Sequence, residues 1–234
     1  MAPSASAGIH VACMVLRGAL TSLILLCGCN PSGGEVLTSA GELIREHPYV
    51  ESATEFRIVN QDGFTQNIAV SMLFGPAHRT RIEWDRKIIF NDGQSLGRFP
   101  DDDGQLWTRE IGNGFAGPVM VVGMAFKHDD ALALAVARER GGSWWKALYG
   151  NQAVAVLRGT DHIVGRACYH VEISGTERDG AFHWWVDKET GCLRRFENQS
   201  RRKEPLKAEI KDAVFNSIQF PRYIPDEQFR QTLR

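Results

Sequence analysis

Three glycines at the spacing of a dinucleotide-binding loop are the first feature of this sequence that could carry chemistry. Gly112-Asn-Gly114-Phe-Ala-Gly117 matches G-x-G-x-x-G and precedes an apolar segment. Such a loop binds a pyrophosphate only within a βαβ unit that has an acidic residue at the end of the next strand. Glu139 lies at about the right distance, but within a predicted helix, and Pro118 follows the last glycine directly. The pattern therefore favours a glycine hinge over a nucleotide site.

Residue types that bind metals are present but not grouped as a metal site requires. His128 adjoins Asp129, and His170 faces His183 across a predicted hairpin. Both pairs could hold zinc weakly, but histidines without a metal are far commoner. Asp101-Asp-Asp103-Gly104 has its glycine too early for a calcium loop and indicates a solvated turn. No nucleophile elbow, phosphate loop or C-x-x-C motif occurs, so we expect no enzyme, metal or cofactor.

Composition sets the broad class of protein. The 234 residues include 27 Lys and Arg against 28 Asp and Glu, a formal net charge of −1. This balance argues against a nucleic-acid partner, which needs a basic surface. With 43% hydrophobic and 24% charged residues the chain is in the globular range. No apolar stretch after residue 30 is long enough to cross a bilayer, so we expect a globular body.

The N-terminal 30 residues have the pattern of an export signal. They contain no acidic residue and one charged residue, Arg17, which precedes an apolar run over 18–27. Leu26-Cys27-Gly28-Cys29 resembles the bacterial lipoprotein signal, in which a small residue precedes the cysteine that is lipidated. Gly28 fits the small position, which makes Cys29 the predicted lipidation site. An ordinary cleaved signal and an uncleaved anchor helix are the alternatives.

This interpretation divides the chain into three parts. Residues 1–28 are a predicted lipoprotein signal peptide, residues 29–36 are the lipidated cysteine with a flexible tether, and residues 37–234 are a single domain. Multiple acyl chains on the N-terminal cysteine would give a stable membrane anchor. Asn30, by resemblance to other lipoproteins, favours the outer over the inner membrane. We expect a protein of the bacterial envelope that is anchored to the outer membrane and faces the periplasm.

Two further cysteines, Cys168 and Cys192, remain in the predicted domain. An even pair in an oxidising compartment suggests a disulfide. However, a predicted three-strand meander over 167–197 places them on strands that are not neighbours, about 9–10 Å apart. That distance is too long for a disulfide unless one end of the sheet curls. A disulfide and two buried thiols both remain open.

Most of the predicted domain reads as antiparallel β-structure. A short helix is expected to start near Thr38, where Ser39 and Glu42 have capping-box spacing, and to end at Pro48. Helices are also expected in the middle, over 131–140 and 144–148. Short runs with partial alternation, separated by turns, predict about ten strands. These are 55–58, 68–74, 80–84, 87–90, 106–111, 153–157, 168–173, 182–187, 192–198 and 209–216.

Three segments resemble motifs of the LolA/LolB superfamily, the outer-membrane lipoprotein-sorting fold. Ile88-Ile-Phe-Asn-Asp-Gly-Gln-Ser-Leu96 resembles its strand followed by a DG turn, and His183-Trp-Trp-Val-Asp-Lys-Glu-Thr-Gly-Cys-Leu-Arg-Arg-Phe-Glu197 resembles its W-x-D-x-x-T-G-L-x-x-R hairpin. Phe215–Phe229 resembles its last strand and P-x-x-x-F tail. The resemblance covers most of the mature chain. It implies an α+β, mainly β fold: a curved, antiparallel, unclosed half-barrel with a helical lid, here about 115–150, over a concave face that holds acyl chains.

The sequence departs from the family pattern at two positions. In the soluble carrier of this superfamily, an arginine precedes the proline between two early strands and helps to hold the lid closed; here Gly75 precedes Pro76. A tryptophan often follows the DG turn in the family, and here Gly97 occupies that position. These departures, together with the predicted lipid anchor, favour a membrane-anchored receptor or sensor over a carrier that shuttles between membranes.

The resulting prediction is a hydrophobic groove. Alternate residues of a strand share one face, and methionines in the lid suit irregular apolar ligands. We therefore expect lipid or lipoprotein acyl chains to bind in the groove. The alternative is a protein-interaction or envelope-sensor module whose core is filled and which binds another envelope protein. The residues predicted to line the groove are Ile68, Val70, Met72, Phe74, Ile82 and Trp84, with Met120 and Met124 from the lid.

Overall fold

The computed structural model describes residues 30–59, 63–100, 104–110, 117–126, 129–176, 180–199 and 209–230. Residues Ser32–Arg234 form one compact unit. The predicted signal peptide, with Arg17, and the predicted lipidation site Cys29 lie outside the described residues. In the described part, no helix combines the length and the apolar character needed to cross a membrane.

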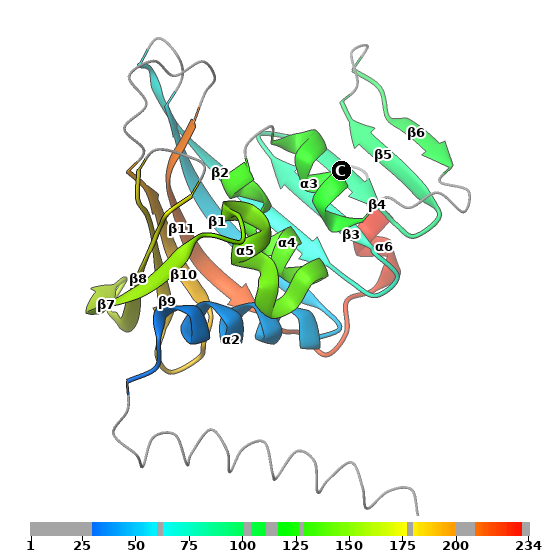
Figure 1. The fold of residues 1–234 in the computed structure, drawn as a ribbon. Helices are drawn as coiled ribbons and strands as arrows, with labels where there is room; N and C mark the ends of the chain where they lie inside the picture. The colour runs from blue at the N-terminus through cyan, green and yellow to red at the C-terminus, as the bar shows by residue number, and fades with distance from the viewer. Residues whose placement is uncertain are drawn as a thin grey trace, which may run out of the picture. The chain divides into compact units, whose positions relative to one another are not determined.

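One antiparallel sheet of eleven strands forms the body of the unit, in the order β6-β5-β4-β3-β2-β1-β11-β10-β9-β8-β7 (Figure 1). The strands β1–β6 form one meander and β7–β11 form another, and the pairing of β1 with β11 joins them into one sheet. The strands β6 and β7 are the two edges of this sheet and do not pair with each other. The predicted mainly β, unclosed antiparallel half-barrel is therefore confirmed. The strands are β1 (Val50–Val59), β2 (Thr65–Phe74), β3 (Thr80–Trp84), β4 (Lys87–Asn91), β5 (Ser95–Phe99), β6 (Trp107–Glu110), β7 (Val154–Ile163), β8 (Arg166–Ser174), β9 (Phe182–Asp187), β10 (Leu193–Asn198) and β11 (Glu209–Gln219).

Helices cover one face of this sheet. The long helix α2 and the group α3–α5 lie in front of it in Figure 1. Their apolar residues and the inward-facing residues of the strands form one continuous hydrophobic cluster, from Val36 of α2 to Ile218 of β11. The helices are α2 (Gly33–Glu46), α3 (Pro118–Ala125), η1 (Asp129–Leu132), α4 (Ala133–Arg140), η2 (Gly141–Ser143), α5 (Trp144–Tyr149) and the C-terminal α6 (Asp226–Arg230).

The helix α2 begins at Gly33, earlier than expected. Ser32 is its N-cap: the Glu35 amide donates to Ser32 Oγ at 3.2 Å, and the Ser32 amide donates to the Glu35 carboxylate at 2.7 Å. Ser32 and Glu35 have the same spacing as Ser39 and Glu42, so the sequence offers two capping boxes and the first is the one used. The expected flexible tether over 29–36 is therefore wrong from Gly33 onward.

Both departures from the family pattern have a packing reason. Phe229 of α6 is fully buried, and a Cβ on Gly75 would lie 2.8 Å from its Cζ atom. Gly97 pairs with Phe90 across β4 and β5, and a Cβ there would lie 2.4 Å from the Phe90 ring. Each glycine thus makes room for an aromatic ring. Phe229 belongs to a second hydrophobic cluster, with Tyr49, Leu73 and Ile224.

Candidate functional site: an apolar mouth beneath α3

The strand residues predicted to line a groove all lie on the helix-covered face of the sheet. Ile68, Val70, Met72 and Phe74 alternate along β2, while Ile82 and Trp84 lie on β3. All six pack in or against the main hydrophobic cluster. Their accessibility differs, because Val70, Met72, Phe74 and Ile82 are at most 3% exposed, whereas Ile68 and Trp84 are only partly buried.

Aromatic side chains of the helical layer pack against this face of the sheet. The ring of Phe126, which follows α3, lies 5.6 Å from the ring of Phe56 on β1 and 5.3 Å from the ring of Trp84 on β3. Further along, Trp144 packs edge-on against Trp184 of β9 with ring centres 5.0 Å apart. Of the six predicted strand residues, Ile68 and Trp84 are the ones that keep partial exposure, and the Phe126 ring packs against Trp84.

Helix α3, which precedes Phe126, has no polar side chain. Its sequence is Pro-Val-Met-Val-Val-Gly-Met-Ala; Val121 and Val122 are buried, while Met120 and Met124 are 45% and 40% exposed. The two methionines are four residues apart and share one face of the helix. The two valines supply the packed face of the helix, and Met120 and Met124 remain accessible.

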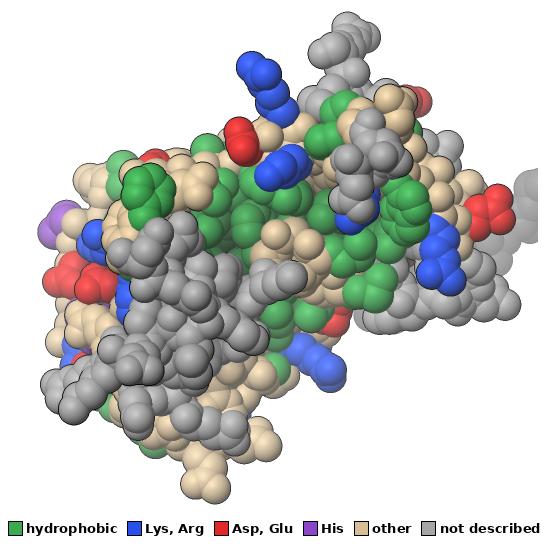
Figure 2. All heavy atoms as spheres, turned by 90° about the horizontal axis from the view of Figure 1, so that it is seen from above, with side chains coloured by type: hydrophobic (Ala, Val, Ile, Leu, Met, Phe, Trp, Pro, Cys, Tyr) green, Lys and Arg blue, Asp and Glu red, His purple; other side chains and the backbone are tan. Residues whose placement is uncertain are grey.

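We refer to Ile68, Trp84, Met120 and Met124 as the apolar mouth. Figure 2 views the molecule from above Figure 1, the side toward which α3 lies. Hydrophobic side chains gather in the middle of this view, and the surface there is hollowed. Met120 and Met124 are among the exposed large hydrophobic residues of the chain. An adaptable, partly exposed apolar surface of this kind is suited to hydrophobic ligands.

The remaining lid helices are held to α2 by polar contacts. The Trp144 indole N–H donates to the Leu37 carbonyl oxygen at 2.8 Å, and the Gly142 amide donates to Glu42 at 2.8 Å. The Arg138 guanidinium donates to carbonyl oxygens at the C-terminal end of α2 and just beyond it. Burial lowers the pKa of Arg138. Residues 133–149 therefore form a fixed part of the helical layer.

Helix α3 has a different attachment. The carboxylate of Glu139 accepts a hydrogen bond from the Val119 amide at 2.9 Å, which satisfies one of the free N–H groups at the start of the helix. The rest of its contact with the body is made by apolar side chains such as Val121, Val122 and Phe126. Among the described contacts, α3 is therefore held mainly by apolar packing, whereas residues 133–149 are also held by several hydrogen bonds.

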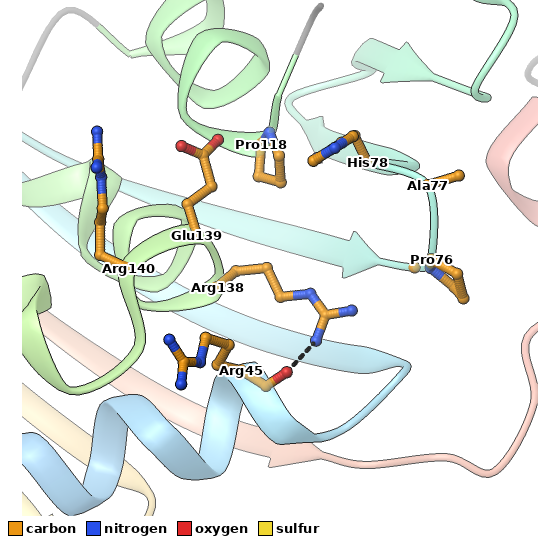
Figure 3. Close-up of a pocket in the computed structure, with 9 residues that line it drawn as sticks. Arg45, Pro76, Ala77, His78, Pro118, Arg138, Glu139 and Arg140 are labelled. Atoms are coloured by element: carbon orange, nitrogen blue, oxygen red, sulfur yellow. Dashed lines mark hydrogen bonds between the residues drawn. The ribbon is translucent and has the colours of Figure 1, made fainter.

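A pocket of about 550 Å³ lies where the start of α3 meets the ends of α2 and α4 and the turn between β2 and β3 (Figure 3). It was not expected from the sequence, because its lining comes from four separate segments. The residues lining it are Arg45, Gly75, Pro76, Ala77, His78, Pro118, Arg138, Glu139 and Arg140.

The histidine pair considered as a weak zinc site is engaged in hydrogen bonds. His170 Nε2 lies 2.9 Å from His183 Nδ1, and His170 Nδ1 lies 3.2 Å from the Asp161 carboxylate, which also accepts from the Trp185 indole N–H. Burial lowers the pKa of His170 despite the nearby Asp161. Within the described ranges, no group of three or more metal-ligating side chains comes together.

Cys168 and Cys192 are free, buried thiols in the structure. Burial raises the pKa of both. Each adjoins Asp187: Cys168 is its partner across β8 and β9, and the Asp187 amide donates to the Cys192 carbonyl oxygen at 2.8 Å. Of the two alternatives for this pair, a disulfide or two buried thiols, the structure has two buried thiols.

Several sequence candidates fall outside the described residues. Of the G-x-G-x-x-G segment only Gly117 is described, as the N-cap of α3. Asp101–Asp103 and His128 are not described, nor is the side chain of Asp129.

Comparisons with known proteins find similar folds at low sequence identity. A LolA superfamily protein from Nitrosomonas europaea is 12% identical over 86% of this chain and 98% of its own, with a TM-score of 0.36. LprF from Mycobacterium bovis is 11% identical over 82% of this chain and 95% of its own, with a TM-score of 0.46. MucB in the MucA/MucB complex of Pseudomonas aeruginosa is 11% identical over 86% of this chain but 61% of its own, with a TM-score of 0.44.

A solved structure of the LolA superfamily is thus among those similar to this chain. Similarity at these values concerns the fold alone. No protein-family model matches the sequence, and no curated protein sequence matches it.

Proposed function

We propose that this chain is an envelope lipoprotein, anchored through Cys29, that binds an acyl chain or another hydrophobic ligand through the apolar mouth. The observation that carries the proposal is the composition of α3. An eight-residue helix without a polar side chain leaves Met120 and Met124 45% and 40% exposed. A surface helix of a globular protein ordinarily has a polar outer face.

A hydrocarbon chain would gain free energy in two steps. Contact with Met120 and Met124 removes apolar surface from water at the mouth, and each methylene group that is buried contributes about 0.8 kcal/mol. Deeper insertion requires α3 to move with Phe126, which would uncover Trp84 and Phe56. The ligand would then take the place of the Phe126 ring against Trp84 and Phe56. The apolar contacts that these two rings lose with Phe126 would be replaced by contacts with the ligand.

The anchor determines how such binding would be used. A chain held at the outer membrane by several acyl groups does not shuttle between membranes. We therefore propose a stationary acceptor or sensor of lipid or lipoprotein acyl chains, facing the periplasm, without enzymatic activity.

The test is binding of a fluorescent fatty acid to residues 30–234, which contain the whole compact unit from Ser32. Met124→Lys places a charge in the mouth and should weaken binding about tenfold or more, without lowering stability, since Met124 is 40% exposed. Val164→Lys is the matched control because Val164, between β7 and β8, is 77% exposed. Unchanged binding in Met124→Lys would contradict the proposed site.

The alternative function is a protein-interaction or envelope-sensor module with a filled core. It is favoured by the burial of Val70, Met72, Phe74 and Ile82, which are at most 3% exposed. In that case the fatty acid should not bind at all, and the exposed methionines of α3 would contact another envelope protein.

A further inference from the structure

The pocket at the start of α3 carries an excess of positive charge. Its lining includes the three arginines Arg45, Arg138 and Arg140 against one carboxylate, Glu139. The chain as a whole has a formal net charge of −1, so this excess is local. The arginines come from two helices, α2 and α4, whose C-terminal ends meet at the pocket (Figure 3).

Two of these arginines lack an acidic partner. The Arg138 guanidinium donates to backbone carbonyl oxygens, including those of Ile44 and Pro48, and these are dipoles without net charge. Within the part of the chain that the structure describes, neither Arg138 nor Arg140 forms an ion pair with a carboxylate. Only Arg45 is paired, with Glu42 at 2.9 Å.

The one carboxylate of the pocket is already engaged elsewhere. Glu139 accepts the Val119 amide at 2.9 Å, so its charge is directed to the N-terminus of α3, where a negative charge is favoured. In Figure 3 its side chain extends toward Pro118, while the Arg138 guanidinium extends toward Pro76. Arg140 is exposed and has no acidic partner among the described residues, so its positive charge remains available to an anion, whereas Arg138 adds positive charge to the lining while its guanidinium donates to carbonyl oxygens.

The opposite wall has no acidic residue and is mostly apolar. It consists of Gly75, Pro76 and Ala77 from the turn after β2, with His78 from the same turn and Pro118 of α3. A volume of about 550 Å³ is in the range of small-molecule sites and exceeds what a bare oxyanion needs. One cationic wall and one apolar wall match the point where an anionic group joins a hydrocarbon chain.

We propose that this pocket binds the oxyanion head group, a phosphate or carboxylate, of the amphiphile whose hydrocarbon chain lies at the apolar mouth. The inference rests on the proposed function and narrows its ligand to an anionic amphiphile. Pro118 lines the pocket and Met124 lies six residues further along the same helix, about 9 Å away at 1.5 Å per residue. A head group beside Pro118 would thus direct its chain along α3.

Three probes separate the head group from the chain: decyl phosphate, decanol and inorganic phosphate, each titrated calorimetrically into residues 30–234. The test variant is Arg45→Gln/Arg140→Gln, because both side chains are exposed and the double substitution leaves Arg138 and its hydrogen bonds to the end of α2 in place. Arg222→Gln is the control, since Arg222 is an exposed arginine outside the pocket. Thermal unfolding of each variant checks that the fold is retained.

We expect decyl phosphate to bind at least tenfold more tightly than decanol, and the double variant to lose this preference while its affinity for decanol is unchanged. Equal affinities for the two decyl compounds, or a preference that persists in the double variant, would overturn the head-group site while leaving the apolar mouth intact. Inorganic phosphate binding as tightly as decyl phosphate would also overturn it, in favour of a free-oxyanion site. Failure of both decyl compounds to bind would overturn the proposed function and the head-group site together.

Discussion

The indole N–H of Trp144 donates to the carbonyl oxygen of Leu37 at 2.8 Å, across the interface between α5 and α2. Both residues are fully buried, and the same indole ring packs edge-on against Trp184 of the sheet. A single side chain therefore joins two helices to the β-sheet. This explains why the second half of the predicted lid is a fixed part of the core.

Replacing Trp144 with phenylalanine should lower the free energy of unfolding by about 2–4 kcal/mol, because it removes a buried hydrogen bond and leaves a cavity. Urea unfolding followed by circular dichroism measures the change. Trp107→Phe is the control: Trp107, on the edge strand β6, is 36% exposed, and we expect a change within about 0.5 kcal/mol. Equal effects in the two variants would contradict the role assigned to Trp144.

A methyl group on Gly75 should conflict with the Phe229 ring. Gly75→Ala is expected to destabilise the protein by about 1–3 kcal/mol, because its Cβ would lie 2.8 Å from Phe229 Cζ. Phe229→Leu should relieve the conflict, so the two changes together should cost less than the sum of each alone. Gly123→Ala in α3 serves as the control, since its Cβ would meet nothing closer than 3.9 Å. That variant should be slightly stabilised, as expected for alanine in a helix.

The carboxylate of Asp187 should make stability depend on acid pH. Burial raises its pKa, but the amides of Thr190 and Glu189 and the guanidinium groups of Arg166 and Arg194 outweigh this effect and lower it overall. The folded-state pKa of Asp187 is below its unfolded-state value of about 3.9. The ionised carboxylate therefore contributes its full stabilising free energy above about pH 3.9, and this contribution is lost as the pH falls through the folded-state pKa.

Unfolding free energies measured at a series of pH values between about 2 and 6 test this linkage. In Asp187→Asn the decline toward low pH should be shallower than in the wild type. Asp85→Asn is the control, because Asp85 is an exposed turn residue. A variant at Asp187 with the same pH slope as the wild type would refute the prediction.

The two thiols of the domain should be unreactive until the protein unfolds. Cys168 and Cys192 are at most 3% exposed, and burial raises the pKa of each, which disfavours the reactive thiolate. Residues 30–234 contain no other cysteine, so a thiol reagent should titrate two groups in denaturant and almost none in buffer. If the reagent titrates no thiol in denaturant without a reductant, Cys168 and Cys192 form a disulfide instead.

The sheet could be predicted from the sequence where one face of a strand is apolar. Along β1 the buried residues alternate strictly with exposed ones, as in Phe56 and Ile58 against Glu55 and Arg57. Strand β5 was missed, because Ser95–Phe99 contains Gly97 and Arg98 and lacks such alternation. Its place depends on pairing with β4, where Phe90 covers Gly97.

The site was harder to predict for two physical reasons. A helix that is apolar all round, such as α3, gives no periodic signal of which face turns inward, so the sequence could not indicate that Val121 and Val122 pack inward while Met120 and Met124 stay accessible. The basic pocket joins Arg45, Pro76, Pro118 and Arg140, which are far apart in the sequence. The long-range contacts between their elements are not encoded in any local pattern.

The most direct test of hydrophobic ligand binding is native mass spectrometry of residues 30–234 purified from a bacterial periplasm, followed by lipid extraction. The proposed function predicts a bound species with the mass of a phospholipid, a fatty acid or an acylated peptide, and its loss or strong reduction in Met124→Lys but not in Val164→Lys. A protein that remains free of ligand, and that takes up no fatty acid when one is added, would show that the half-barrel is filled and would contradict the account.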